Sequence, residues 1–519
     1  MRVLVFSIVL VVCCTAQWSP LSEQGRSAIV HLFEWRWKDI ADECENFLAP
    51  YGYAGVQVSP PNENVVAKNN DVQRPWWERY QPISYKLETR SGTEEDFKDM
   101  VRRCNDVGVR IYADAVINHM SGWWPTGTAA TGGSSFDAGL EKYDGVPYSK
   151  LDFNDANCYS NSGGIDNWND INQVRNCKLE GLNDLNQSKD YVIGMISDYL
   201  NHLICLGVAG FRIDAAKHIW PGDLDAILEG LNDLNTNHGF PNGSRAFIYQ
   251  EVKDFGTEPI KAEDYYDSGR VTEFRFADNM MHLFHKQNQL HWLSNFGEAW
   301  GMQPSGYALV FVDNHDSQRD GSTLSYKDSR PYKMATAYTL AWDYGEPKVM
   351  SSFKFDNRDQ GPPHDDNYNL LPVTFNDDLT CNNGYVCEHR WRQIYNMVHF
   401  RNVAGGEAVS NWWDNGSNQI AFCRGNKAFL AINNDDYNLN ERLQTCLPAG
   451  DYCDVISGNL EVDQRCTGVK ISVGSNGKAQ ITIDHTAEDP MVAIHLESRI
   501  GSCVGNDFNY YHPFASGKH

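Results

Sequence analysis

Residues 210–214 read Gly210-Phe211-Arg212-Ile213-Asp214, a short apolar run that carries one arginine and ends on an aspartate. The run predicts a buried strand, because it is brief, begins with glycine and contains a β-branched and an aromatic residue. Residues 190–205, just before it, have apolar positions at helical spacing. A helix followed by a buried strand is half of a strand-helix-strand unit, which indicates a parallel sheet.

The same kind of run occurs eight times in the chain. The runs are residues 28–33, 55–59, 110–116, 210–214, 246–251, 271–276, 308–313 and 348–352. Amphipathic stretches, such as residues 94–105, separate most of them. Eight alternating units predict an α/β fold of the (β/α)8 TIM-barrel type.

Two regions depart from this alternation. Residues 118–185 are rich in Gly, Asn and Asp and too long for an ordinary loop, so they predict an irregular domain inserted after the third strand. Residues 419–499 contain short alternating strands, including 419–422, 428–432, 479–483 and 491–495, which predict an antiparallel β-sandwich. The barrel then comprises residues 17–117 and 186–418, and residues 500–519 form a polar tail without an assigned role.

The N-terminus and the composition indicate where the protein works. Residues 1–16 combine a basic start, an apolar run and the small-residue ending Thr15-Ala16, which predicts a secretory signal peptide. The chain has 519 residues and a net charge of −24, which disfavours nucleic acid and anionic membranes as partners. We therefore expect a secreted protein, a monomer, with a neutral substrate.

Twelve of the 14 cysteines lie after the predicted signal, so disulfides are expected in an oxidising compartment. The spacing suggests pairs such as 44/104, 158/177, 381/387 and 453/466, but spacing alone does not fix connectivity. Cys205, within the helical run, is expected to be a buried free thiol, and the state of Cys503 is open. No zinc-type Cys/His cluster occurs, and sequons begin at Asn186, Asn242 and Asn415.

Acidic residues stand at the ends of three predicted strands: Asp214, Glu251 and Asp316. Because the C-terminal ends of barrel strands form the active face, these carboxylates are expected to converge. Converging carboxylates suit acetal hydrolysis, in which one attacks or stabilises the sugar cation and another protonates the leaving oxygen. Arg212, two residues from Asp214, points to the same side of the strand and can keep that aspartate ionised.

Any one of these aspartates, taken alone, is better explained as a solvated loop end or helix N-cap. Three acidic residues together at strand ends favour an active site instead. Aromatic residues accompany them: Trp76 and Trp77 follow the second strand, and Trp123 and Trp124 follow the third. A groove that stacks sugar rings explains these pairs, although Trp124 also fits a place in the core.

Four segments resemble the signature motifs of the animal-type α-amylases, a retaining family of (β/α)8 glucosidases, and the resemblance covers essentially the whole chain after the signal. The segments are 114–119 (DAVINH), 210–218 (GFRIDAAKH), 249–252 (YQEV) and 311–316 (FVDNHD). The resemblance implies endo-hydrolysis of α-1,4-glucosidic bonds in starch, glycogen and maltooligosaccharides, with retention. It also implies an extracellular, digestive role.

The resemblance assigns roles residue by residue. Asp214 is implied as nucleophile, Glu251 as general acid/base and Asp316 as the group that binds the −1 sugar and stabilises the transition state. The substrate-binding residues that it implies are Trp76, Trp77, Tyr80, Asp114, His119, Arg212, Lys217, His218 and His315.

Two ions are also implied. Structural Ca²⁺ would be held by Asn118, Asp184 and the carbonyls of Arg175 and His218, which would pin the insertion to the barrel. The resemblance also implies the family's four shared disulfides, Cys44–Cys104, Cys158–Cys177, Cys381–Cys387 and Cys453–Cys466. Cys423 and Cys446 would be a candidate extra pair. Activating Cl⁻ would be held by Arg212, Asn314 and Lys348, where the lysine replaces an arginine and lacks its bidentate fork.

A second departure from the vertebrate pattern is the short loop 317–322, which lacks a Gly-rich stretch and indicates an invertebrate-like enzyme. Two rivals remain open at this stage. A maltase or glucanotransferase could use the same barrel and would give different products. A catalytically dead binding relative would have lost a carboxylate, whereas this chain keeps all three.

Overall fold

Eight parallel strands close into a barrel in the computed structural model, which describes residues 16–68 and 72–501. Their order around the barrel is β1-β10-β9-β8-β7-β6-β3-β2. The strands are β1 (Ile29–Leu32), β2 (Gly55–Val58), β3 (Arg110–Ala115), β6 (Gly210–Ile213), β7 (Phe247–Gln250), β8 (Arg270–Thr272), β9 (Ala308–Val310) and β10 (Glu346–Ser351). The predicted (β/α)8 barrel is therefore confirmed.

Nearly every residue of these strands is buried, because inward side chains fill the barrel and outward ones meet the helices. The helices are α1 (Trp37–Glu43), α2 (Glu94–Asp106), α3 (Ile171–Asn176), α4 (Asp190–Cys205), α5 (Pro221–Glu229), α6 (Phe274–Phe284), α7 (Ser317–Asp320), α8 (Arg330–Ala341) and α9 (Arg392–Ala404). Helix α2 shows how the sequence sets an end: Thr93 and Asp96 form a reciprocal capping box.

Two details of the sequence prediction were wrong. The sixth run was expected to be strand over 271–276, but β8 ends at Thr272 and Phe274 already starts α6. The Glu273 side chain accepts the Arg275 N–H and caps this helix, so a local cap overrides the strand pattern. Cys205 is free as expected, but it is exposed, because it ends α4 on the face away from the barrel.

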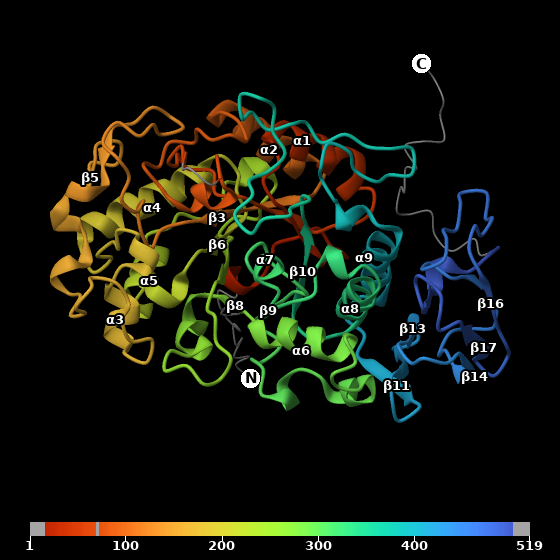
Figure 1. Ribbon diagram of the computed structural model, residues 1–519. Helices are drawn as coiled ribbons and strands as arrows, with labels where there is room; N and C mark the ends of the chain where they lie inside the picture. Colours follow the sequence, from red (N-terminus) through yellow and green to blue (C-terminus); the bar gives the residue numbers. More distant parts are fainter. Residues whose placement is uncertain (1–15, 69–71, 502–519) are drawn as a thin grey trace, which may run out of the picture.

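The insertion after β3 is a small irregular layer beside the barrel rim, drawn in orange and yellow in Figure 1. It contains the two-stranded pair β4 (Phe136–Asp137) and β5 (Lys142–Tyr143), several single turns and the short helix α3. Its two ends meet, since the Leu185 N–H donates to the Asn118 carbonyl at 3.0 Å. The insertion therefore leaves and re-enters the barrel at one place.

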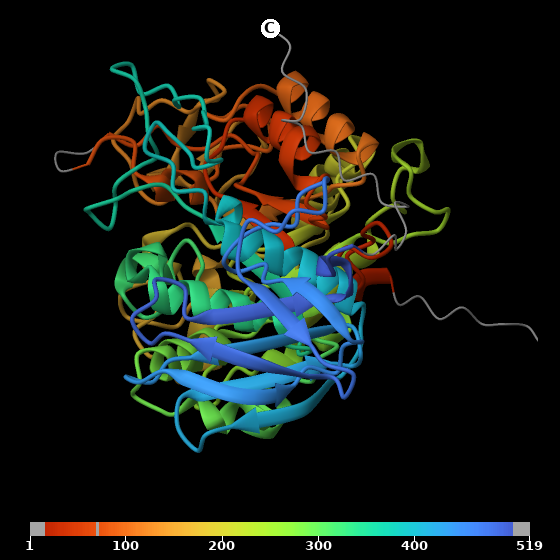
Figure 2. The same ribbon diagram turned by 90° about the vertical axis from the view of Figure 1, so that its right-hand side faces the viewer.

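The C-terminal region is an antiparallel β-sandwich of two four-stranded sheets, seen in blue in Figure 2. One sheet contains β11 (Val409–Asp414), β12 (Gln419–Arg424), β13 (Ala428–Asn433) and β18 (Met491–His495). The other contains β14 (Leu439–Gln444), β17 (Lys478–Ile483), β16 (Lys470–Val473) and β15 (Gly450–Cys453). The four strands expected from the sequence are present, and β11 lies before residue 419.

The disulfides Cys44–Cys104, Cys158–Cys177, Cys381–Cys387 and Cys453–Cys466 are all formed, together with the candidate extra pair Cys423–Cys446. Five bridges fit a protein of an oxidising, extracellular compartment. Within the described ranges, no helix has the length and apolar character needed to cross a bilayer. The predicted signal peptide, apart from Ala16, lies outside the described residues, as do Cys503 and the tail from residue 502.

Candidate active site

At the mouth of the barrel, a single guanidinium, that of Arg212, contacts three carboxylates. Arg212 Nη1 donates to Asp114 Oδ1 and to Asp214 Oδ1, each at 2.7 Å, and Arg212 Nη2 lies 2.7 Å from Glu251 Oε1. The arginine and the two aspartates are buried, whereas Glu251 keeps some exposure. Carboxylates from β3, β6 and β7 are thus brought together around a single charge, as the strand-end argument predicts.

Asp316 completes the group from the loop after β9. Its Oδ2 lies 3.4 Å from Nε2 of His315, and its side chain is about half exposed (46%). The Asn314 side chain fixes the loop, because its Oδ1 accepts the N–H groups of Asp316 and Ser317. The least enclosed carboxylate is therefore the one expected to contact sugar.

The backbone after β6 is strained at the site. Ala215 has φ of 49°, a left-handed conformation that alanine rarely adopts. In this conformation its N–H donates to Glu251 Oε2 at 2.9 Å. Strain at a residue next to a candidate nucleophile is typical of sites where the surrounding structure enforces geometry.

The pKa values of the three carboxyl groups are shifted in different directions. Burial, reinforced by Glu251 and Asp114, raises the pKa of Asp214 well above its usual range despite Arg212. Burial also acts on Glu251, but the Arg212 charge and the Ala215 N–H outweigh it and lower its pKa. Although the Asp316 side chain is open on one side, desolvation by the protein around it and the Glu251 charge raise its pKa to about 7. The three carboxyl groups interact closely enough to titrate as one unit, in which Arg212 and the Ala215 N–H favour the charged form of Glu251.

Aromatic rings line one end of the site. The Tyr80 ring stacks on His315 with centroids 5.0 Å apart, and Trp76 meets His315 edge-on at 5.5 Å. The Tyr80 hydroxyl donates to Asp114 Oδ2 at 2.9 Å. His119 Nε2 donates to the Tyr80 carbonyl at 3.0 Å, and burial lowers the His119 pKa to about 4, so this histidine is neutral.

The opposite end is formed by η8 (Ala216–His218) and the insertion. The Lys217 N–H donates to the Glu251 carbonyl, and its Nζ donates to the Lys253 carbonyl at 2.6 Å. His218 Nδ1 donates to the Val174 carbonyl at 2.8 Å. Trp168, which the sequence argument missed, meets the His218 ring edge-on at 6.0 Å and is 54% exposed. The sequence feature that could have identified Trp168 is that it is an aromatic residue in an otherwise polar loop.

The residues expected to hold chloride include a second buried cation, Lys348. Lys348 Nζ donates to Gln57 Oε1 at 2.7 Å, and the Tyr249 hydroxyl donates to the same oxygen. Burial and the nearby Arg212 charge lower the Lys348 pKa to about 7. Asn314 follows the neighbouring strand β9, but its side-chain oxygen Oδ1 already accepts the Asp316 N–H within the same loop. Two cations that repel each other in a buried space suit an anion between them.

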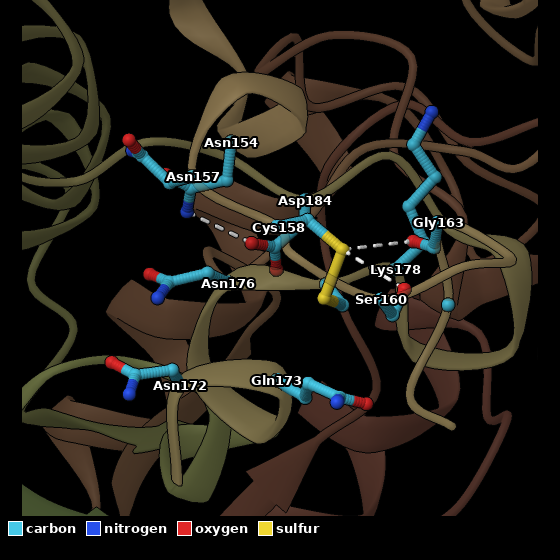
Figure 3. Close-up of a disulfide and its surroundings, with 12 residues drawn as sticks. Asn154, Asn157, Cys158, Ser160, Gly163, Asn172, Gln173, Asn176, Lys178 and Asp184 are labelled. Carbon is cyan, nitrogen blue, oxygen red and sulfur yellow. Dashed lines mark hydrogen bonds between the residues drawn. A yellow bond between two sulfur atoms is a disulfide. The ribbon is translucent and has the colours of Figure 1, made fainter. Parts of the chain in front are cut away.

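The residues expected to hold calcium lie where the insertion rejoins the barrel. Asn118 Oδ1 is buried without a hydrogen-bond partner, and Asp184 accepts Asn154 Nδ2 at 2.9 Å (Figure 3). Burial raises the Asp184 pKa well above its usual range, which identifies a carboxylate short of positive charge.

Helix α3, which carries Arg175, is tied to η8 by the His218 bond to Val174. Over the described residues, no three His, Cys, Asp or Glu side chains form a metal cluster. The set of asparagine, aspartate and carbonyl oxygens is nevertheless the hard donor type that calcium prefers.

Comparisons with known proteins agree with this geometry. Residues 76–345 match the family model "Alpha amylase, catalytic domain", and residues 410–497 match "Alpha amylase, C-terminal all-beta domain". The chain is 56% identical to human alpha-amylase 2B and 55% identical to human pancreatic alpha-amylase, each over 94% of this chain and 98% of the relative.

Among solved structures, a mutant of α-amylase I from Eisenia fetida in complex with maltohexaose superposes with a TM-score of 0.87. Its sequence identity is 46%, covering 92% of this chain and 98% of that one. The wild-type Eisenia fetida enzyme matches equally well. With its barrel, carboxylate cluster and C-terminal sandwich, the chain belongs to the animal α-amylase family of glycoside hydrolases, in an invertebrate-like form.

Proposed function

We propose that this protein is a secreted endo-acting α-amylase that hydrolyses internal α-1,4-glucosidic bonds of starch and glycogen with retention. The observation that carries the proposal is the Arg212 guanidinium, which bonds to Asp114, Asp214 and Glu251 together. Two carboxylates bonded to one guanidinium stand close together, and retaining glycosidases need a separation of only about 5–5.5 Å. The family match and the relatives support the substrate class.

In the first step, a carboxylate oxygen of Asp214 attacks the anomeric carbon of the −1 sugar while the bond to the glycosidic oxygen breaks. Glu251 gives its proton to that oxygen, and Asp316 binds the −1 sugar and stabilises its positive charge. In the second step, Glu251 takes a proton from water, and the hydroxide displaces Asp214 with a second inversion. The anomeric configuration is therefore retained.

The acid role requires a proton on Glu251, which the bond to Arg212 opposes. An anion held by Arg212 and Lys348, with Asn314 beside them, would offset the guanidinium charge and raise the Glu251 pKa. Chloride is the family's candidate for this role. Lysine gives one point charge rather than a fork, so we expect weaker binding than with arginine.

Calcium would have a structural role. Asn118, Asp184 and the carbonyls of Arg175 and His218 would hold the ion, which neutralises Asp184 and ties the insertion to η8. His218 belongs both to this junction and to the substrate end of the cleft. A bound ion would therefore support this wall of the cleft without taking part in bond cleavage.

The remaining substrate contacts follow from the two ends of the cleft. Trp76, Trp77, Tyr80, His119 and His315 contact the −1 sugar and the sugars on its non-reducing side. Lys217, His218 and Trp168 contact the sugars on the reducing side of the cut. The proposed partners are maltooligosaccharides and their polymers, and the protein is proposed to act as a monomer. The relatives and the disulfides support a digestive, extracellular setting.

The test is a starch digest with product sizing, repeated with EDTA and with chloride omitted. We expect a mixture of short maltooligosaccharides and a rapid loss of iodine staining, because internal cuts shorten the polymer quickly. Glucose as the sole product would point to an exo-acting maltase, and larger transfer products to a glucanotransferase. Starch binding without turnover would indicate a catalytically dead relative.

A further inference from the structure

The segment after β3 runs alongside the end of η3 (Trp76–Tyr80) and is held there by successive hydrogen bonds. His119 Nε2 donates to the Tyr80 carbonyl, and the Ser121 N–H donates to the Pro82 carbonyl at 2.9 Å. The Gln81 side-chain oxygen accepts both the Gly122 N–H at 3.3 Å and Trp124 Nε1 at 2.8 Å. These bonds fix the position of Trp124 relative to the substrate end of η3.

Trp124 then lies beside Trp77. Their ring centroids are 6.3 Å apart and the ring planes differ by 29°, an offset stack in which the rings cover each other only in part. Both indoles are partly buried against the core and keep some exposed surface. The single polar atom of Trp124 is already bonded to Gln81, so what it offers to the solvent is aromatic surface in a fixed orientation.

The pair lies on the β2 side of the barrel mouth, whereas Glu251 follows β7. The acid protonates the oxygen of the departing sugar, so the reducing side of the substrate lies toward Glu251, Lys217 and His218. Segment η3 follows β2, which is separated from β6 and β7 by β3 in the barrel order. Trp76, Tyr80 and His315 form an aromatic wall beside Asp114 and Asp316, and Trp77, the next residue after Trp76 in η3, stacks on Trp124.

We propose that Trp124 extends the aromatic wall beyond Trp77 and adds a binding subsite for one more glucose unit on the non-reducing side of the cut. This inference rests on the proposed function, because it needs an α-glucan in the cleft. The apolar C–H face of a glucose ring packs on an indole face, and removing that area from water stabilises the bound chain. The benefit is available only to substrates long enough to reach Trp124.

The experiment compares substrates of different length in Trp124→Ala. We expect the ratio of kcat/KM for maltoheptaose to that for maltotriose to fall about fivefold or more, through KM rather than kcat. Trp124→Phe keeps a ring and should restore much of the ratio. Trp292→Ala is the matched control, because Trp292 is an exposed tryptophan (54%) in η11 (Leu290–Asn295), which packs against the C-terminal sandwich strand β12.

A wild-type ratio in Trp124→Ala, or the same ratio in Trp124→Ala and Trp124→Phe, overturns the subsite. An equal loss of kcat/KM for both substrates also overturns it, since it would show a structural role. If Trp124→Ala does not fold, Trp124→Phe and Trp124→Leu are compared in its place, and equal ratios in these two contradict the proposal. Failure of the proposed function is a separate outcome, in which the wild-type protein cleaves neither substrate.

Discussion

The mouth of the barrel and the C-terminal sandwich differ in where they place charged side chains: the mouth buries them, and sandwich strands such as β17 expose them to solvent. At the mouth, Arg212 and three carboxylates are packed together with little access to water. In the sandwich, β17 alternates strictly, with Lys478, Gln480 and Thr482 outward and apolar residues inward. Buried ions cost desolvation energy that a neighbour must offset, whereas an alternating strand buries only apolar groups.

Features that cost folding free energy are concentrated at the mouth of the barrel, where the catalytic residues lie. Strain at Ala215, raised aspartate pKa values and a lysine with a pKa near 7 all occur in the barrel mouth. The sandwich instead adds a disulfide, Cys423–Cys446, between its two sheets. Changes in the mouth should therefore act on catalysis, and matched changes in the sandwich on stability alone.

The largest expected effect is that of Glu251→Gln. The amide cannot donate the proton to the leaving oxygen, so kcat should fall by about 10²–10⁴-fold or more. Starch hydrolysis and the unfolding midpoint are measured together. Glu441→Gln, at an exposed position of β14 in the sandwich, is the matched control and should keep full activity. Near-wild-type turnover in Glu251→Gln would remove this residue from its role.

Next is the calcium junction. Asp184→Asn removes the only carboxylate of the proposed ligand set, so EDTA should no longer lower the unfolding midpoint. In the wild type, calcium at 100 times its Kd should add about 2.7 kcal/mol to the free energy of unfolding. Calorimetry with and without EDTA measures both.

The sandwich supplies a matched control, Asp435→Asn, because Asp435 also accepts bonds from asparagine and serine side chains. That variant should keep the EDTA response. A wild-type EDTA response in Asp184→Asn would place the ion elsewhere.

A smaller effect concerns the anion site. The folded-state pKa of Lys348 is lowered to about 7, so its charge is present below that pH and lost as the pH rises through it. The chloride concentration for half-maximal activity should therefore rise between pH 6 and pH 8. In Lys348→Arg it should stay nearly constant, since arginine remains charged.

Lys470→Arg, on the exposed face of β16, is the control for this exchange and should behave as wild type. A chloride requirement with the same pH dependence in wild type and Lys348→Arg would separate Lys348 from anion binding. The measurement is a chloride titration of initial rates at each pH.

The smallest effect on activity is expected from Cys423→Ser with Cys446→Ser. The bridge spans 23 residues, and removing it should lower the free energy of unfolding by about 3 kcal/mol in the chain-entropy description. The rate of starch hydrolysis and its response to EDTA should not change. A loss of kcat in this double variant would show that the sandwich influences the barrel mouth.

The sequence was sufficient to predict the architecture. Eight strand-like runs with acids at their ends predicted the barrel and the convergence of Asp214, Glu251 and Asp316 at one end of it, because strand direction determines where those side chains point. That Arg212 also bonds to Glu251 was not predicted. Nor did the sequence predict the stack of Trp77 on Trp124 or the contact of Trp168 with His218. Both depend on how the insertion folds back on the rim, which no periodic pattern encodes.

The errors in predicting individual elements have local structural causes. The cap formed by Glu273 ended β8 early, and the exposed face of α4 left Cys205 in solvent. The strands β14, β15 and β16 were missed because they carry many polar residues, and β15 and β16 are also only four residues long. Such strands are stabilised by their neighbours in the sheet rather than by their own sequence pattern.

The most direct test of the central claim is the anomeric configuration of the first product. Proton NMR of maltoheptaose hydrolysis, recorded before mutarotation, should show the α-anomer of the new reducing end. That result follows from attack by Asp214 and a second inversion by water. Initial formation of the β-anomer would mean direct attack by water and would contradict the assigned roles of Asp214 and Glu251.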